Sequence, residues 1–108
     1  TRALSFLHIL RRIYIMDAKF ELGRVVITKG AAERLENDDE FYAFVEESLA
    51  RYTQGDWGDT CDEDKKTNDA AIKDNDRILA VYKYENTTIW IITECDRSVT
   101  TILFPSEY

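Results

Sequence analysis

The chain has 108 residues, of which 44% are hydrophobic and 12% aromatic, which is enough for one hydrophobic core and too little for two. This composition excludes an intrinsically disordered chain. No apolar run approaches the roughly 20 residues needed to cross a bilayer, and two cysteines are too few for a disulfide scaffold. We therefore expect one soluble, cytoplasmic domain that does not enter membranes.

The net charge of −7 is concentrated in the middle of the chain. Residues 1–30 carry a net charge of +4, residues 31–77 carry −9 and residues 78–108 carry −2. An anionic block of this kind repels nucleic acid and attracts basic protein surfaces. The alternative is an ordinary solvated helical surface that keeps the protein in solution.

Residues 1–15 differ in character from the rest of the chain. The only methionine is Met16, and the Arg11-Arg12 pair follows the apolar run, whereas a secretory signal carries its positive charge before the apolar region. We interpret residues 1–15 as an extension upstream of a natural start at Met16, which leaves a single domain over residues 16–108. The alternative is an added amphipathic helix or edge strand.

The first half of the domain is expected to contain one strand, a short helical turn and one longer helix. Residues 20–28 are rich in β-branched side chains and predict a strand, and residues 31–36 predict a short helical turn. A helix is expected over residues 40–53, because its apolar residues recur at helical spacing. We expect Asp38 or Asp39 to be its N-cap and Gly55 to be its C-cap.

A compact turn over residues 55–59 contains Trp57 and leads to a second, mostly polar helix over residues 61–73. Thr60 and Glu63 match the spacing of a capping box, in which each side chain would satisfy a free backbone amide. Trp57 is flanked by glycines, and we favour a buried plug over an exposed contact for its ring.

Three runs with alternating apolar residues close the chain. They cover Ile78–Tyr84, residues 89–93 and residues 99–104, joined by short polar links, which predicts an antiparallel meander. With the strand over residues 20–28, the sequence predicts an α+β fold: an antiparallel sheet of three or four strands with two main helices packed on one face.

The link between the last two strands, residues 94–98, holds the densest group of reactive side chains. Glu94, Asp96 and Arg97 could bind a charged group or perform acid–base catalysis. The alternative, which we favour, is an ion-paired turn in which Asp96 caps the backbone and Arg97 reaches the acidic helices.

The remaining chemistry is sparse. Cys61 and Cys95 lie beside acidic residues, which oppose thiolate formation and favour structural thiols. The only histidine, His8, lies in residues 1–15, so the domain proper lacks the commonest general base and zinc ligand. The carboxylates that follow Cys61 lack the spacing and glycine of a calcium loop. We expect no metal, no cofactor and no direct nucleic-acid binding.

Several short motifs are similar to those of a family of small bacterial proteins from plasmids and integrative elements, labelled "plasmid-related" or as a restriction-system subunit. They are Leu22-Gly23-Arg24-Val25-Val26, Gly55-Asp56-Trp57-Gly58, Asp64-Lys65, Asn68-Asp69, Ile89-Trp90-Ile91-Ile92-Thr93-Glu94, Asp96-Arg97-Ser98, Thr100-Thr101-Ile102-Leu103, Pro105 and Glu107-Tyr108. The resemblance covers roughly residues 20–108 and carries over no catalytic residue. It implies a mobile-element setting, where small acidic proteins often inhibit host defence.

The first functional hypothesis is therefore an accessory protein that binds a partner with a basic surface. Its anionic helices would occupy the nucleic-acid groove of a restriction or CRISPR nuclease, because spaced carboxylates can replace backbone phosphates. The residues expected to contact the partner are Asp56, Trp57, Asp59, Asp62, Glu63, Asp64 and Asp69.

Two alternatives remain open. A helix followed by an antiparallel sheet resembles ribosome-dependent endoribonuclease toxins, with Glu94, Asp96 and Arg97 as the active group. Those toxins are usually basic, so the net charge of −7 counts against this hypothesis. The other alternative is a homo-oligomeric structural module.

Overall fold

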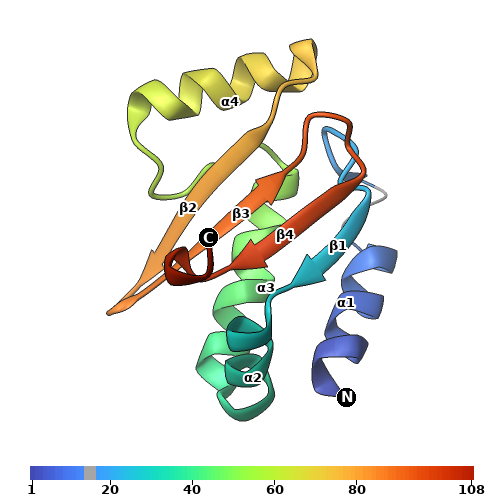
Figure 1. The fold of residues 1–108 in the computed structure, drawn as a ribbon, viewed down its shortest axis with the longest axis vertical. Coiled ribbons are helices and arrows are strands. Elements are labelled where there is room, and N and C mark those ends of the chain that lie inside the picture. Colours follow the sequence, from blue (N-terminus) through green and yellow to red (C-terminus); the bar gives the residue numbers. More distant parts are fainter. Residues whose placement is uncertain (14–16) are drawn as a thin grey trace.

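Four strands form one sheet in the order β1-β4-β3-β2 (Figure 1). The structure is a computed structural model that describes residues 1–13 and 17–108, so the expected start at Met16 lies outside the described residues. The strands are β1 (Arg24–Ile27), β2 (Ile78–Tyr84), β3 (Thr87–Thr93) and β4 (Val99–Leu103). The predicted α+β class is confirmed.

The sheet is mixed, which corrects the expectation of a purely antiparallel one. Strands β2, β3 and β4 form the antiparallel meander, whereas β1 lies parallel to β4, with Arg24 beside Val99 and Ile27 beside Ile102. Short links force consecutive strands to run antiparallel. Strand β1 is separated from β4 by most of the chain, so no local link sets its direction.

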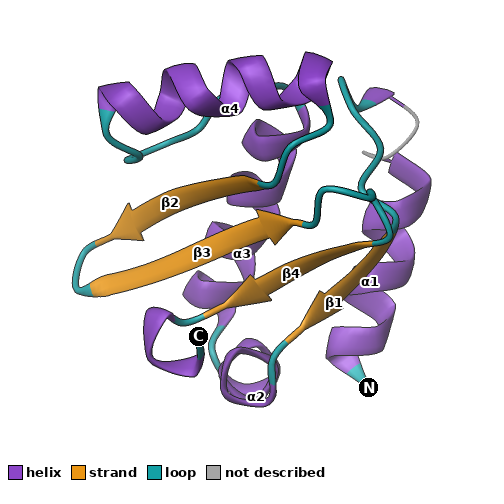
Figure 2. Cartoon of the chain, turned by 45° about the horizontal axis from the view of Figure 1, so that its top comes forward, coloured by secondary structure: helices purple, strands orange, loops and turns teal. Residues whose placement is uncertain are grey.

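Within residues 1–13 and 17–108, four helices and a final 3-10 turn accompany the sheet. They are α1 (Arg2–Ile13), α2 (Lys29–Asn37), α3 (Asp39–Thr53), α4 (Asp62–Asp74) and the turn Pro105–Glu107. Figure 1 shows α3 lying across one face of the sheet, whereas α4 runs beside β2 (Figure 2). The second main helix thus sits at an edge of the sheet, which revises the expectation that both helices share one face. No helix within residues 1–13 and 17–108 is both long enough and apolar enough to span a membrane.

The core lies between α3 and the sheet. Its fully buried members include Val45, Leu49, Ile89, Ile91 and Ile102. A chain of hydroxyl groups crosses this core: the Tyr52 hydroxyl bonds to Thr93 (2.7 Å), Thr93 bonds to Thr100 (2.7 Å), and Thr100 donates to the Leu22 carbonyl (2.7 Å). Burial raises the pKa of the Tyr52 hydroxyl well above its ordinary value, so this group stays protonated.

The N-cap of α3 is confirmed, because the Asp38 carboxylate accepts the Phe41 N–H (3.0 Å). Strand β1 is shorter than predicted. Gly23, with φ of +63°, turns the chain just before Arg24, and Phe20 packs against Tyr52 in the core instead of joining the sheet.

Helix α1 packs on the domain as an amphipathic helix, which is the alternative that the sequence left open for residues 1–15. Phe6 is 1% exposed and contacts the Tyr42 ring edge-on. The Glu36 carboxylate accepts the Ala3 N–H (2.7 Å) and the Arg2 N–H (3.3 Å), so it satisfies the first amides of the helix. These bonds lower the pKa of Glu36.

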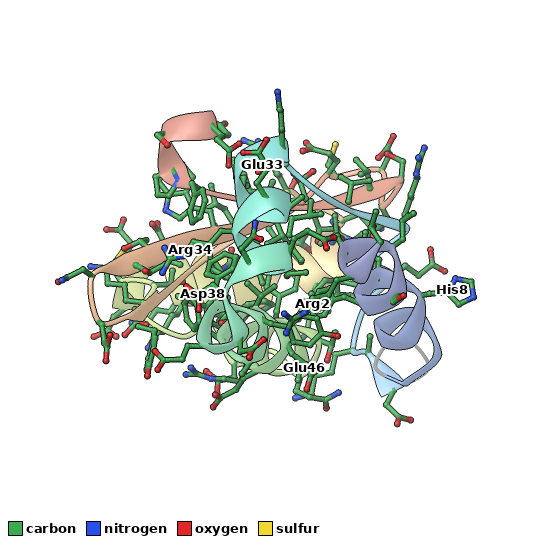
Figure 3. All side chains as sticks on the ribbon, turned by 90° about the horizontal axis from the view of Figure 1, so that it is seen from below. Arg2, His8, Glu33, Arg34, Asp38 and Glu46 are labelled. Carbon is green, nitrogen blue, oxygen red and sulfur yellow. The ribbon has the colours of Figure 1, made fainter. Side chains whose placement is uncertain are left out.

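We expect Arg2→Ala to lower the free energy of unfolding by about 1 kcal/mol, because Arg2 both stacks on the Tyr42 ring (4.4 Å) and pairs with Asp39 (2.8 Å). His8→Ala is the matched control, since His8 projects away from the body of the molecule (Figure 3) and should change stability by less than about 0.5 kcal/mol. Urea unfolding measures both values. Equal effects would contradict the docking of α1 through Arg2.

Candidate functional site

The connection between α3 and α4 runs along the outer edge of β2. The Asp59 N–H donates to the Val81 carbonyl (2.8 Å), and the Asp59 carboxylate accepts the Lys83 N–H (2.8 Å). Gly58 forms an isolated parallel bridge with Val81. Asp59, one of the residues expected to contact a partner, is therefore held by the backbone of the sheet.

Two further side chains complete the closure of this edge. The Thr60 hydroxyl accepts the Val81 N–H (2.9 Å), while the Asn68 side chain accepts the Leu79 N–H (3.3 Å) and donates to the Leu79 carbonyl (2.9 Å). Exposed edge strands are sites of unwanted pairing. The connection between α3 and α4, together with Asn68 of α4, therefore protects β2 by occupying its free hydrogen-bonding groups.

The predicted capping box is wrong. The Thr60 hydroxyl donates to the Trp57 carbonyl (2.5 Å), because the side chain turns inward toward β2. Helix α4 begins at Asp62, and its N-cap, Cys61, makes no side-chain capping bond. The pairing with β2 thus overrides a local capping signal.

Trp57 is a buried plug. Its ring is 3% exposed, packs against Phe20 and Tyr52, and donates its indole N–H to the Asp69 carboxylate (2.8 Å). Because the ring lies inside, it offers no surface to a partner. The Asp69 carboxylate holds α4 against this plug.

Asp56 also helps to hold the connection between α3 and α4 in place. Its carboxylate forms a bidentate salt bridge with Arg51 (2.8 and 3.1 Å) and accepts the Gly58 N–H (3.1 Å). The hydrogen bond from Arg51 is the main reason why the pKa of Asp56 lies below its ordinary value. The pair anchors the turn that leads from α3 to α4.

The lowered pKa of Asp56 predicts how the stability of the protein changes with pH. A carboxylate whose pKa is depressed by folding stabilises the protein above its unfolded pKa, about 3.9 for aspartate, and loses this effect as the pH falls through its folded pKa. We expect Asp56→Asn to be less stable than the wild type at about pH 7 and the difference to shrink below about pH 4. Urea unfolding at both pH values measures it, and a difference independent of pH would contradict the ion pair.

The other three residues expected to contact a partner remain free. Asp62, Glu63 and Asp64 are exposed and form the first turn of α4, where carboxylates complement the helix dipole. Of the fifteen acidic residues in 31–77, only Asp38, Asp39 and Asp56 form ion pairs with residues that the structure describes. We call Asp62, Glu63 and Asp64 the acidic turn.

The alternative site over residues 94–98 is built as a structural turn. Arg97 has φ of +59°, and its guanidinium donates to the carbonyls of Ala71 (2.7 Å), in the last turn of α4, and Asp76 (2.7 Å), just beyond the helix. Asp96 accepts both the N–H and the hydroxyl of Ser98, and Glu94 pairs with Arg77 (3.3 Å). Each member of the proposed catalytic group is thus engaged by a different structural partner.

Cys61 and Cys95 are exposed and unpaired with each other. Within residues 1–13 and 17–108, no three histidine, cysteine, aspartate or glutamate side chains gather in a way that could hold a metal ion.

Sequence reasoning missed Asn68 as a key residue of this region. The signal was its spacing, since Asn68, Ala71 and Ile72 form one stripe on an otherwise polar helix. Asn68 and Ala71 are buried, and Ile72 packs against the core. A buried amide on such a stripe indicates a backbone partner, because buried polar groups are almost always hydrogen-bonded.

No family model matches this sequence, and comparisons with curated proteins and with solved structures gave no match. The resemblance to the plasmid-related family stays a prediction. The functional assignment therefore rests on the residues and on the geometry of the acidic turn and its frame.

Proposed function

We propose that this protein acts by binding a protein partner with a basic surface, and that the acidic turn of α4 is its main contact. The observation that carries this proposal is that the acidic residues between Asp56 and Asp69 fall into two groups. Asp56, Asp59 and Asp69 are bound to protein groups, whereas the three carboxylates of the acidic turn have no cation among the described residues.

The frame around α4 supports this proposal, because a fixed array of charges binds with less loss of conformational entropy. The Trp57–Asp69 bond and the Asn68–Leu79 bonds attach the middle of α4 to the rest of the molecule. Arg97 bonds to the carbonyls at its end. The acidic turn is therefore presented on a helix held at several points.

The charge of the segment favours a particular class of partner. Residues 31–77 carry −9, and a negative field of this kind steers the protein toward positive clefts and away from nucleic acid. The clefts of DNA-cleaving enzymes are positive, because they bind a polymer with about one charge per 1.7 Å. We propose an accessory protein of a mobile element that inhibits a restriction or CRISPR nuclease by mimicking nucleic acid.

A panel of purified restriction and CRISPR nucleases tests this proposal. We expect the full chain to bind at least one of them and to slow its DNA cleavage at about 50 mM salt, with much weaker inhibition at about 500 mM, because salt screens exposed charges. Full nuclease activity across the panel at low salt, with no detectable binding, would remove nuclease inhibition as the function.

A further inference from the structure

The two edges of the sheet are treated differently. On β2, both backbone groups of Leu79 and Val81 and the N–H of Lys83 are occupied by Asp59, Thr60 and Asn68. On β1, pairing is with β4 alone, and no described residue forms a ladder with its other edge. Because proteins close edges that must not pair, an edge with free hydrogen-bonding groups, opposite a closed edge, is a candidate for a binding surface.

The free groups on β1 follow from its parallel pairing. The Arg24 N–H donates to the Ser98 carbonyl (3.0 Å), and the Thr28 N–H donates to the Ile102 carbonyl (3.0 Å). In a parallel ladder the two backbone groups of one residue face the same side, and successive residues alternate. The N–H and C=O groups of Val25 and Ile27 therefore point away from β4, as two donors and two acceptors in line.

These groups face a groove between β1 and α1, which lie side by side in Figures 1 and 2. The groove has a volume of about 420 Å³ and is lined by Ala3, Leu4, Leu7 and His8 of α1 and by all four residues of β1. Leu4 is 67% exposed, so a large apolar side chain of the groove lining is largely uncovered.

We propose that this groove binds an extended segment of a partner protein, which adds a fifth strand to the free edge of β1. Strand addition of this kind uses backbone hydrogen bonds for affinity and alternate side chains for specificity. Val25 and Ile27 pack toward the core, on the same side of the sheet as α1. Apolar side chains of the segment opposite Val25 and Ile27 therefore enter the groove and contact Leu4 and Leu7.

Charge selects a partner rather than a second copy of this chain. Residues 1–30 carry +4 within a protein of −7, and Arg24 is exposed at one end of β1. A second copy would bring the same positive charge to the pairing, whereas an acidic residue opposite Arg24 would complement it. The preferred segment has two apolar residues at alternate positions and an acidic residue beside them.

Amide hydrogen exchange on the full chain tests the proposal. The probe is a synthetic peptide of about nine residues with two valines separated by one threonine and a glutamate next to them. In the free protein the Val25 and Ile27 amides should exchange rapidly while the Val26 amide is protected. With about 1 mM peptide, exchange at Val25 and Ile27 should slow at least about tenfold.

Matched variants and peptides locate the effect. Leu4→Glu should weaken peptide binding at least about tenfold, whereas Tyr84→Glu, which places the same charge at an exposed residue on β2, should not. A peptide with adjacent valines, or with lysine in place of glutamate, should bind more weakly. Protected Val25 and Ile27 amides in the free protein, protection that depends on protein concentration, or no protection at about 1 mM peptide would each overturn the proposal.

Discussion

Replacing Asn68 with alanine is expected to lower the free energy of unfolding by about 2–4 kcal/mol, because it leaves two backbone groups of β2 without partners at once. Asn68 is 3% exposed, and its amide both accepts the Leu79 N–H and donates to the Leu79 carbonyl. A buried backbone donor or acceptor left unpaired costs about 1–3 kcal/mol. The loss also reopens an edge strand, so we expect faster aggregation on heating.

Thr67→Ala is the matched control for this prediction. Thr67 precedes Asn68 on α4, but its exposed hydroxyl only donates to the Glu63 carbonyl of its own helix (3.2 Å). Its removal should change stability by less than about 0.5 kcal/mol. Chemical unfolding of both variants distinguishes a specific bond to β2 from a general sensitivity of α4, and similar losses in both would contradict the edge closure.

Arg97→Ala is expected to cost about 2 kcal/mol, because a charged donor is lost from the carbonyls of Ala71, Asp76 and Glu94. Arg97→Gly loses the same hydrogen bonds. It relieves the left-handed backbone at φ of +59°, which costs a residue with a side chain about 1–2 kcal/mol. We therefore expect the glycine variant to be roughly 1 kcal/mol more stable than the alanine variant.

The same residue separates the structural turn from the toxin hypothesis. If Arg97 served catalysis, its replacement would relieve growth inhibition caused by expression of the wild-type protein. The structural role predicts instead that expression of the wild type does not inhibit growth. It also predicts that Arg97→Ala and Arg97→Gly change only the stability of the protein. Growth inhibition by the wild type that Arg97→Ala abolishes, at unchanged protein levels, would contradict the structural role.

The meander and α3 could be predicted because their signals are local. Alternation within β2, β3 and β4 and the cap at Asp38 each involve neighbours in sequence. The direction of β1 could not be predicted in this way. Its partner, β4, lies about seventy residues further along the chain, and four residues hold too little pattern to choose between two orientations.

The candidate site could be predicted only in part, because the sequence shows where the carboxylates lie along the chain but not which groups they bond to. Asp59 bonds to the Lys83 N–H, which lies 24 residues away, and Asp69 bonds to the Trp57 ring. Both contacts depend on how α4 lies against β2. The exposure of the acidic turn could be predicted locally, since a helix start exposes its first side chains to solvent.

The most direct test of the account compares two triple variants of equal net charge. One is Asp62→Asn/Glu63→Gln/Asp64→Asn in the acidic turn, and the other is Glu21→Gln/Glu47→Gln/Glu85→Gln at exposed sites elsewhere. Inhibition of a nuclease that the wild type inhibits should weaken at least about tenfold for the first and less than about threefold for the second. Equal inhibition by the two variants would contradict the acidic turn as the contact surface.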